Sequence, residues 1–359
     1  MDFPLRYNPA WNGLRAVAAL LVIADHCRVP GFAGGYFGVD LFFVLSGFLI
    51  TRLLVEEFEA HGRIDLPAFY WRRLLRLSPP LLFMLAFYLA LAPSAWPQLG
   101  FWEHARDAAF AAFYLSDYTL VLLHQPLLLL HTWSLAVEEQ FYLIWPLVVL
   151  MLTRLTWRWR ITVLIVLYGL AAMWRIAEHG RVEWNEIYFR LDTRLCGLIL
   201  GAILALCFRR LGSLSRQSAD IAGLFAGVAL FVCVTQAYWQ IPGGLIWMTA
   251  LVKISTVVLL IASAVPDSRV SAVLSVRPLV AAGTISYGLY LWHYTVAVYF
   301  RETLSWYQTF PIVLAVAFAG ATTSWFLIEQ PLRRYRRAVG PARPAAVLPP
   351  ETGIAVKAS

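Results

Sequence analysis

The sequence predicts an all-α integral-membrane protein, a polytopic bundle of about ten transmembrane helices. Hydrophobic residues make up 60% of the 359 positions and charged residues only 14%, whereas soluble domains carry about 25% charged residues. The mean hydropathy is +0.67. Apolar runs also recur along almost the whole chain, and many are long enough for a bilayer core about 30 Å thick. These observations exclude an ordinary soluble domain.

The apolar runs define ten candidate spans. They cover residues 14–28, 36–54, 77–92, 134–153, 161–177, 189–208, 219–238, 245–264, 279–300 and 309–328. The first run is retained as a span and not as a cleaved signal, because Asp25 and His26 interrupt its outer end and no small-residue cleavage site follows. Residues 105–130 contain Asp107 and Asp117, so we expect an interfacial or re-entrant segment there.

The basic residues predict the side of the membrane that each loop faces. With the N-terminus inside, few arginines remain outside, namely Arg28, Arg106, Arg175, Arg181, Arg190 and Arg301. The inner loops and the tail hold most of the others, which matches the positive-inside rule. Both termini are therefore predicted to be cytoplasmic. The net charge of +8 is explained by an anionic inner leaflet, and no nucleic-acid partner is expected.

The C-terminal tail and the cysteines complete the domain prediction. Residues 1–337 are expected to form one membrane domain, and residues 338–359, rich in Pro and Ala, a disordered cytoplasmic tail. The four cysteines have no metal-ligand spacing and lie in or beside apolar runs, so we expect buried thiols and no metal site. No internal repeat is found. Any chemistry must then use residues of the helices and their loops.

Arg15 and His26 are the leading functional clue. They are eleven residues apart on the first span, which is close to three helical turns, so both side chains share one face about 16 Å apart along the axis. Polar groups on a membrane-spanning helix usually face a protein interior or a water-filled cavity. The pair therefore predicts a polar path along this helix.

Asp40 opens the second span after a short glycine-rich turn, so we expect it near His26. A carboxylate beside an imidazole fixes its tautomer and raises its basicity, as a general base requires. The alternative is that Asp40 caps a helix or binds interfacial water. Ser46 and Gly47 follow on the same span and are expected to permit close helix packing.

Two further segments carry charges. Arg72, Arg73 and Arg76 precede the third span and present clustered guanidinium groups suited to phosphate; the alternative is an anchor for anionic lipid. Glu138 and Glu139 lie in an apolar helix and point about 100° apart, so at least one must face the interior. A buried polar network that only holds helices together is the alternative for these two acids.

The sixth and ninth predicted spans supply the remaining candidates. Arg190 and Arg194 are four residues apart with Asp192 between them, and His293 lies toward the outer end of the ninth span. Gly197 continues the face of Arg194 at the small-residue spacing of tightly packed helices. The Arg190, Asp192 and Arg194 group and His293 are each also compatible with a structural hydrogen-bonded network. A histidine beside aromatic residues, as His293 is, is typical of the aromatic belt at the membrane interface.

In combination these segments resemble the bacterial integral-membrane acyltransferase-3 family of O-acyltransferases. The matching stretches are NGLRAVAALLVIADH, GYFGVDLFFVLSGFLIT, RRLLRLSPP, HTWSLAVEEQFYLIWPL, FRLDTRLCGLILGA, ISYGLYLWH and IEQPLRRY, in the family's order. Members have about ten spans with both ends in the cytoplasm. They transfer acyl groups, most often acetyl from acetyl-CoA, to sugar hydroxyls of surface polysaccharide, lipopolysaccharide, peptidoglycan or secreted glycosides.

The resemblance assigns roles to the candidate residues. It implies a multi-pass protein of the cell inner (plasma) membrane, with an acyl-CoA donor, a glycan acceptor and no metal. His26 is the expected catalytic residue, and whether it carries the acyl group or only removes a proton stays open. The expected site residues are His26, Asp40, Glu138 and Glu139 for catalysis; Arg15, Arg72, Arg73 and Arg76 for the donor; and Asp192, Arg194 and His293 for the acceptor.

Other functions are kept as alternatives. A proton-coupled exporter or lipid-linked glycan translocator also uses buried carboxylates and titratable histidines on its spans, and a membrane scaffold or sensor is a third possibility. Some family members carry an additional C-terminal extracytoplasmic esterase-like domain, for which the residues after 337 are too few. Labelled acetyl-CoA separates these hypotheses, because only the enzyme moves the label.

Overall fold

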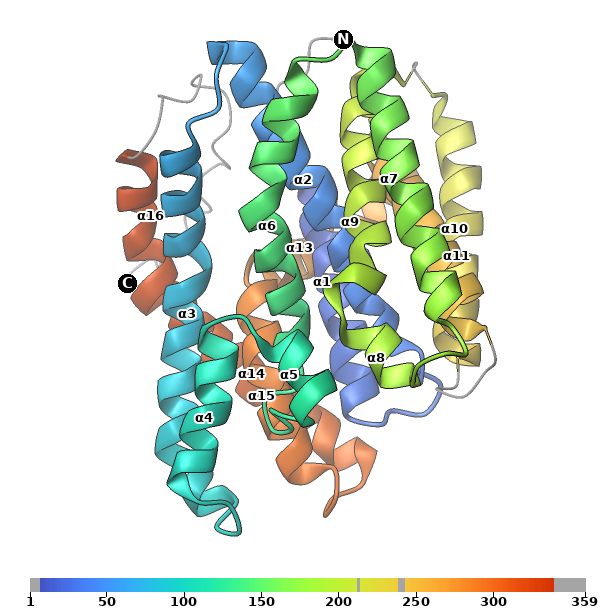
Figure 1. Cartoon of the computed structure of the whole chain (residues 1–359). Helices are drawn as coiled ribbons and strands as arrows, with labels where there is room; N and C mark the ends of the chain where they lie inside the picture. Colours follow the sequence, from blue (N-terminus) through green and yellow to red (C-terminus); the bar gives the residue numbers. More distant parts are fainter. Residues whose placement is uncertain (1–6, 212–213, 238–242, 339–359) are drawn as a thin grey trace, which may run out of the picture.

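The computed structural model describes residues 7–211, 214–237 and 243–338, and this part of the chain forms helices without any strand (Figure 1). Each expected span corresponds to a helix: α1 (Pro9–His26), α2 (Gly38–His61), α3 (Leu66–Ala95), α6 (Thr132–Thr153), α7 (Trp157–Glu178), α9 (Leu191–Cys207), α10 (Arg216–Gln236), α11 (Gly244–Ala264), α14 (Ser286–Phe300) and α15 (Trp306–Ser324). The predicted polytopic helical bundle is confirmed.

Eight segments in the described residues are long and apolar enough to cross a membrane. Helices α1 and α14 are outside this set; α14 has only 15 residues, and α1 contains Arg15 and Asp25. The two expected spans that do not meet this length and hydropathy criterion are the ones that carry His26 and His293.

Shorter helices connect the spans. They are η1 (Gly35–Phe37), α4 (Phe101–Ala112), α5 (Ser116–Leu123), α8 (Trp184–Phe189), η2 (Phe208–Arg210), α12 (Arg269–Leu274), α13 (Arg277–Thr284), the π-helical η3 (Trp325–Glu329) and α16 (Gln330–Ala338). With 12 and 8 residues, α4 and α5 are too short to cross a bilayer core, as expected for 105–130. The predicted tail lies outside the described residues from position 339 onward.

Helix α2 runs through the centre of the bundle, in contact with α1, α6, α9 and α11 (Figure 1). Its crossing with α9 brings the two backbones together. A Cβ atom on Gly47 would lie 1.9 Å from the carbonyl oxygen of Leu198, and one on Gly201 would lie 2.1 Å from that of Val44. Small residues allow this approach. The expected packing role of Gly47 is confirmed.

Helix α1 contacts α2, α13 and α14. It begins at Pro9, a favoured first helical residue, and the Asn8 side chain accepts a hydrogen bond from the backbone N–H of Ala10. Because α14 packs along α1, His293 is brought to the end of α1 where His26 lies. Helix α15 covers the other side of α14.

The outer helices expose large apolar side chains to their surroundings. Many lie on α7 and α10, including Trp159, Leu170, Leu224, Phe225 and Phe231. An apolar surface of this kind is too large for a soluble monomer and is typical of contact with lipid. Many of the buried polar side chains lie instead on α2, α6, α9, α11 and α14.

Candidate active site

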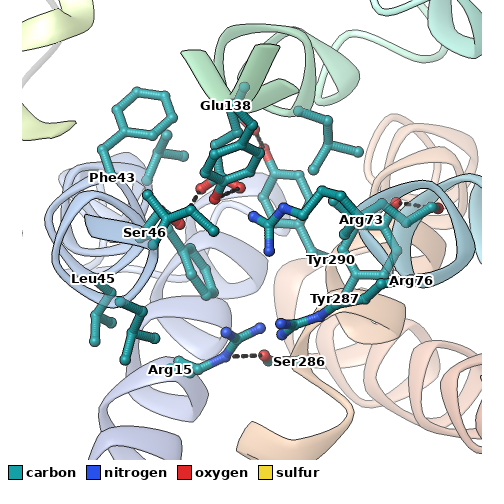
Figure 2. A pocket seen from close by; sticks show the side chains of 18 of the residues that line it. Arg15, Phe43, Leu45, Ser46, Arg73, Arg76, Glu138, Ser286, Tyr287 and Tyr290 are labelled. Atoms are coloured by element: carbon teal, nitrogen blue, oxygen red, sulfur yellow. Dashed lines mark hydrogen bonds between the residues drawn. The ribbon is translucent and has the colours of Figure 1, made fainter. Parts of the chain in front are cut away.

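A cavity of about 120 Å³ lies between α1, α2, α3, α6 and α14 (Figure 2). One wall is apolar and is contributed mainly by α2. The polar lining residues are Arg15, Ser46, Arg73, Arg76, Ser134, Glu138, Tyr142, Ser286, Tyr287 and Tyr290. Three arginines and a single glutamate face this space, so its lining is net positive.

Two of the arginines in the lining contact uncharged side chains. Arg15 donates from Nε to the Ser286 hydroxyl at 3.1 Å. The Arg73 guanidinium lies 3.6 Å from the ring centroid of Tyr142, and its Nε is buried without a hydrogen-bond partner in the described part of the chain. Figure 2 shows Arg15 and Arg73 pointing toward a common space with Arg76 beside it. This arrangement suits an anionic ligand.

Glu138 is the acid that faces the cavity. Its carboxylate accepts hydrogen bonds from the Ser46 hydroxyl at 2.7 Å and from the Tyr142 hydroxyl at 3.2 Å. Glu139 is not among the lining residues. The prediction that at least one of the two acids faces the interior is therefore confirmed by Glu138, and Ser46, expected as a packing residue, binds it.

Arg72 does not line the cavity. It forms a 3.2 Å ion pair with Glu57 on α2. Arg72 and Arg73 are adjacent on a helix and so point about 100° apart. Of the four expected donor residues, the structure brings three together and places Arg72 on another face.

A second polar centre is a cluster of three histidines. His26 Nδ1 lies 2.9 Å from His293 Nε2, and the two rings are stacked with centroids 5.1 Å apart. The His131 ring lies 5.6 Å from that of His293 and stacks on Tyr294, whose ring also packs edge-on against His26. His131 and His293 are buried, and His26 is half-buried.

Tyr290 joins the cavity to the histidine cluster. It lines the cavity, and its hydroxyl lies 2.6 Å from the Ser134 hydroxyl and donates to the backbone carbonyl of His131 at 2.9 Å. Its ring centroid is 5.4 Å from that of His293. One tyrosine side chain therefore separates the two centres. Arg15 in the cavity and His26 in the cluster both contact α14, through Ser286 and His293, so the two residues share one face of α1.

The expected contact between Asp40 and His26 is wrong. The Asp40 carboxylate accepts from Arg194 at 3.2 Å and lies 3.7 Å from the Lys253 ammonium. All three side chains are buried, and two buried cations require a counter-charge far more than a neutral imidazole does. Asp40 therefore faces α9 and α11, and the nitrogen that contacts His26 belongs to His293.

The three expected acceptor residues are not in one place. Asp192 binds the Arg190 guanidinium and accepts from the Trp174 indole at 2.7 Å. The Arg194 guanidinium is fully buried, over the ring of Tyr188 at 4.6 Å and beside Asp40. In the described residues neither contacts the histidine cluster. Of the three, only His293 lies against His26.

The residues of the site that sequence reasoning missed include His131, Tyr290 and Tyr294. A weak signal existed for His131, because it is one of only seven histidines in the chain and opens the segment that contains Glu138. Nothing in the sequence indicates that a tyrosine on α14 separates two polar centres. That information resides in the packing of α14 against α1 and α6.

Residues 8–329 match the acyltransferase-3 family, whose model is described as an acyltransferase domain. The chain is 35% identical over 355 residues to the O-acetyltransferase OatA of Staphylococcus aureus (strain NCTC 8325 / PS 47), covering 92% of this chain and 58% of that protein. It is 33% identical over 357 residues to the peptidoglycan O-acetyltransferase OatA of Listeria monocytogenes, covering 92% and 56%. The chain thus spans little more than half the length of these relatives. No solved structure matches it.

Proposed function

Because the chain belongs to the integral-membrane acyltransferase-3 family, we propose that it is a membrane O-acyltransferase that moves an acyl group, in the first instance acetyl, from acyl-CoA to a sugar hydroxyl of a surface or exported glycan. The observation that carries the proposal is the junction of a cationic cavity with a histidine pair. One centre suits an anionic donor, and the other suits proton transfer.

The donor is assigned to the cavity lined by Arg15, Arg73 and Arg76. Guanidinium groups bind phosphate oxygens strongly, and the net positive lining supports an anionic ligand. At about 120 Å³, the cavity is smaller than the roughly 300–1,000 Å³ typical of small-molecule sites. It therefore suits the narrow acyl-bearing arm of CoA, with the nucleotide held nearer the cavity mouth.

The proposed orientation places the donor on the cytoplasmic side of an inner (plasma) membrane. Arginines are enriched where the chain passes from α2 to α3, from α6 to α7 and from α9 to α10, and in the C-terminal segment, which supports cytoplasmic termini under the positive-inside rule. His26 then lies toward the outer half of the bundle. The acyl group would travel from a cytoplasmic thioester toward an external hydroxyl.

In the proposed reaction, His26 accepts the proton of the sugar hydroxyl. The hydroxyl oxygen attacks the carbonyl carbon of the thioester, and a C–O bond forms as the C–S bond breaks. The departing CoA sulfur takes the proton from the imidazolium, so that the charges balance. General-base catalysis of this kind contributes about 10²–10⁴-fold to rate. The partial exposure of His26 and its contact with His293 support this role.

Peptidoglycan is the first acceptor to test, because one relative is named a peptidoglycan O-acetyltransferase. The purified protein in lipid nanodiscs would be mixed with radiolabelled acetyl-CoA and muropeptides, with dextran-type and lipopolysaccharide glycans as parallel acceptors. We expect label in a base-labile ester on one acceptor class. If the label stays on CoA with every acceptor, the acyltransferase proposal fails. Transport of unmodified glycan into vesicles without label transfer would favour the translocator.

A further inference from the structure

The direction of the hydrogen bonds around His293 follows from its backbone neighbours. Its Nδ1 lies 2.7 Å from the carbonyl oxygen of Tyr290 and 3.2 Å from that of Leu289. A carbonyl oxygen can only accept, so Nδ1 of His293 must carry the proton. In the neutral ring, Nε2 then has only a lone pair. His293 therefore presents an acceptor to its neighbour.

That neighbour is Nδ1 of His26, 2.9 Å from His293 Nε2. Since His293 Nε2 accepts, Nδ1 of His26 must donate, and the neutral His26 ring then has no proton on Nε2. In the described residues no hydrogen bond is found at this Nε2. We infer that His293 is a positioning residue that holds His26 as its Nδ1–H tautomer, so that Nε2 of His26 is the atom that accepts the sugar proton.

The opposite polarity is disfavoured by the surroundings. It requires a doubly protonated His293, or the loss of both backbone hydrogen bonds of that ring. Among the described residues no carboxylate forms an ion pair with either ring, and burying an imidazolium without a counter-ion is costly. His293 thus fixes the tautomer of its partner ring with a neutral nitrogen, as the carboxylate does in a Ser-His-Asp triad, but without the negative charge that stabilises an imidazolium there.

The tautomer can be measured without turnover. Protein labelled with ¹⁵N-histidine in nanodiscs would be studied by two-bond ¹H–¹⁵N correlation, with His26→Ala used to assign the signal. We expect the parent His26 to carry its proton on Nδ1. A proton on Nε2 of His26 would overturn the inference. Because no substrate is needed, this result is independent of whether the proposed acyl transfer, on which the catalytic role of Nε2 rests, is correct.

Kinetics then test the role. His293→Phe keeps an aromatic ring but removes the acceptor, and we expect kcat to fall about 10²–10³-fold with the donor KM within about twofold. His293→Asn restores a carbonyl acceptor and should recover kcat to within about tenfold of the parent. His104→Phe is the matched control, since His104 is also fully buried and bonds Tyr88 on α3.

Two results would overturn the positioning role. One is a kcat for His293→Phe within about threefold of the parent. Loss of the Nδ1–H tautomer of His26 should slow the chemical step and so lower kcat. The other is a His293→Asn enzyme no faster than His293→Phe, which would show that the shape of the ring matters and the acceptor does not. If His293→Phe fails to fold, the NMR measurement of the His26 tautomer in the parent protein tests the positioning role in its place.

Discussion

Two of the polar centres in the described part of the bundle differ in how their groups are satisfied. The Asp40, Arg194 and Lys253 centre is made of full charges, is buried throughout, and ties α2 to α9 and α11. The histidine centre is made of neutral rings, includes the half-buried His26, and adjoins a cavity through Tyr290. A buried charge pair destabilises the protein strongly when one partner is removed, which suits a structural role. Neutral titratable groups beside a cavity are suited to proton transfer.

Loss of His26 should give the largest effect on activity. We expect His26→Ala to lower kcat/KM for acetyl transfer by about 10³–10⁴-fold, at the upper end for a general base that reacts directly with substrate. Thermal unfolding in detergent should be nearly unchanged, because the ring is half-buried and bears no full charge. Activity is measured by transfer of labelled acetyl, with His104→Phe as the control. Near-parental activity of the folded variant would remove His26 from the mechanism.

Asp40 should show the reverse pattern. Asp40→Ala leaves Arg194 and Lys253 buried without their counter-charge, and removing one partner of such a pair costs about 3–5 kcal/mol. The free energy of unfolding, measured by denaturant titration in mixed micelles, reports this loss. Glu302→Ala breaks the exposed pair with Arg28 and should change little. Equal stability of Asp40→Ala and the parent would contradict a structural role for this centre.

Arg73 should affect donor binding more than folding. Loss of a charge-assisted contact costs about 1.5–3 kcal/mol, so Arg73→Ala should raise the donor KM about 10–100-fold. Arg72→Ala is the matched control, because Arg72 is the adjacent residue and pairs with Glu57 outside the cavity. The ratio of the two KM values is the informative quantity. Equal effects of both substitutions would show that the basic segment acts through its overall charge.

Ser46 should give the smallest effect. Ser46→Ala removes one of the two hydrogen bonds to the Glu138 carboxylate, and a bond to a charged group is worth about 1.5–3 kcal/mol at most, less where water replaces it in the cavity. We expect a change in kcat/KM of about tenfold or less and no change in membrane insertion. Steady-state kinetics measure it. A loss as large as that of His26→Ala would move the reacting centre to Glu138.

The sequence predicts the helices far better than the contacts between them. Hydropathy locates the spans, and the three-turn spacing correctly places Arg15 and His26 on one face of α1, where both contact α14. Hydropathy does not fix the rotation of a helix about its own axis. For this reason the sequence predicts Asp40 on the α1 side of α2, and the structure places it toward α9 and α11. Its true partners, Arg194 and Lys253, are 154 and 213 positions further along the chain, and no local pattern indicates which distant cation a buried acid will meet.

The histidine cluster illustrates the same limit. His26 and His293 are 267 residues apart in sequence, and each alone is compatible with an interfacial residue. Their contact depends on the packing of α14 along α1, which neither the local sequence pattern nor the family resemblance indicates. Glu138 was easier to predict, because two adjacent acids on one helix cannot both avoid the interior.

The central claim is that the cationic cavity and the histidine pair form one site. Its most direct test is a cryo-EM structure of the protein in nanodiscs with a non-hydrolysable acetyl-CoA analogue. We predict that the phosphates lie toward Arg73 and Arg76. We also predict that the acetyl carbonyl lies beyond Tyr290, with room for one sugar hydroxyl between it and Nε2 of His26. An analogue bound with its acetyl group away from His26 would contradict the account.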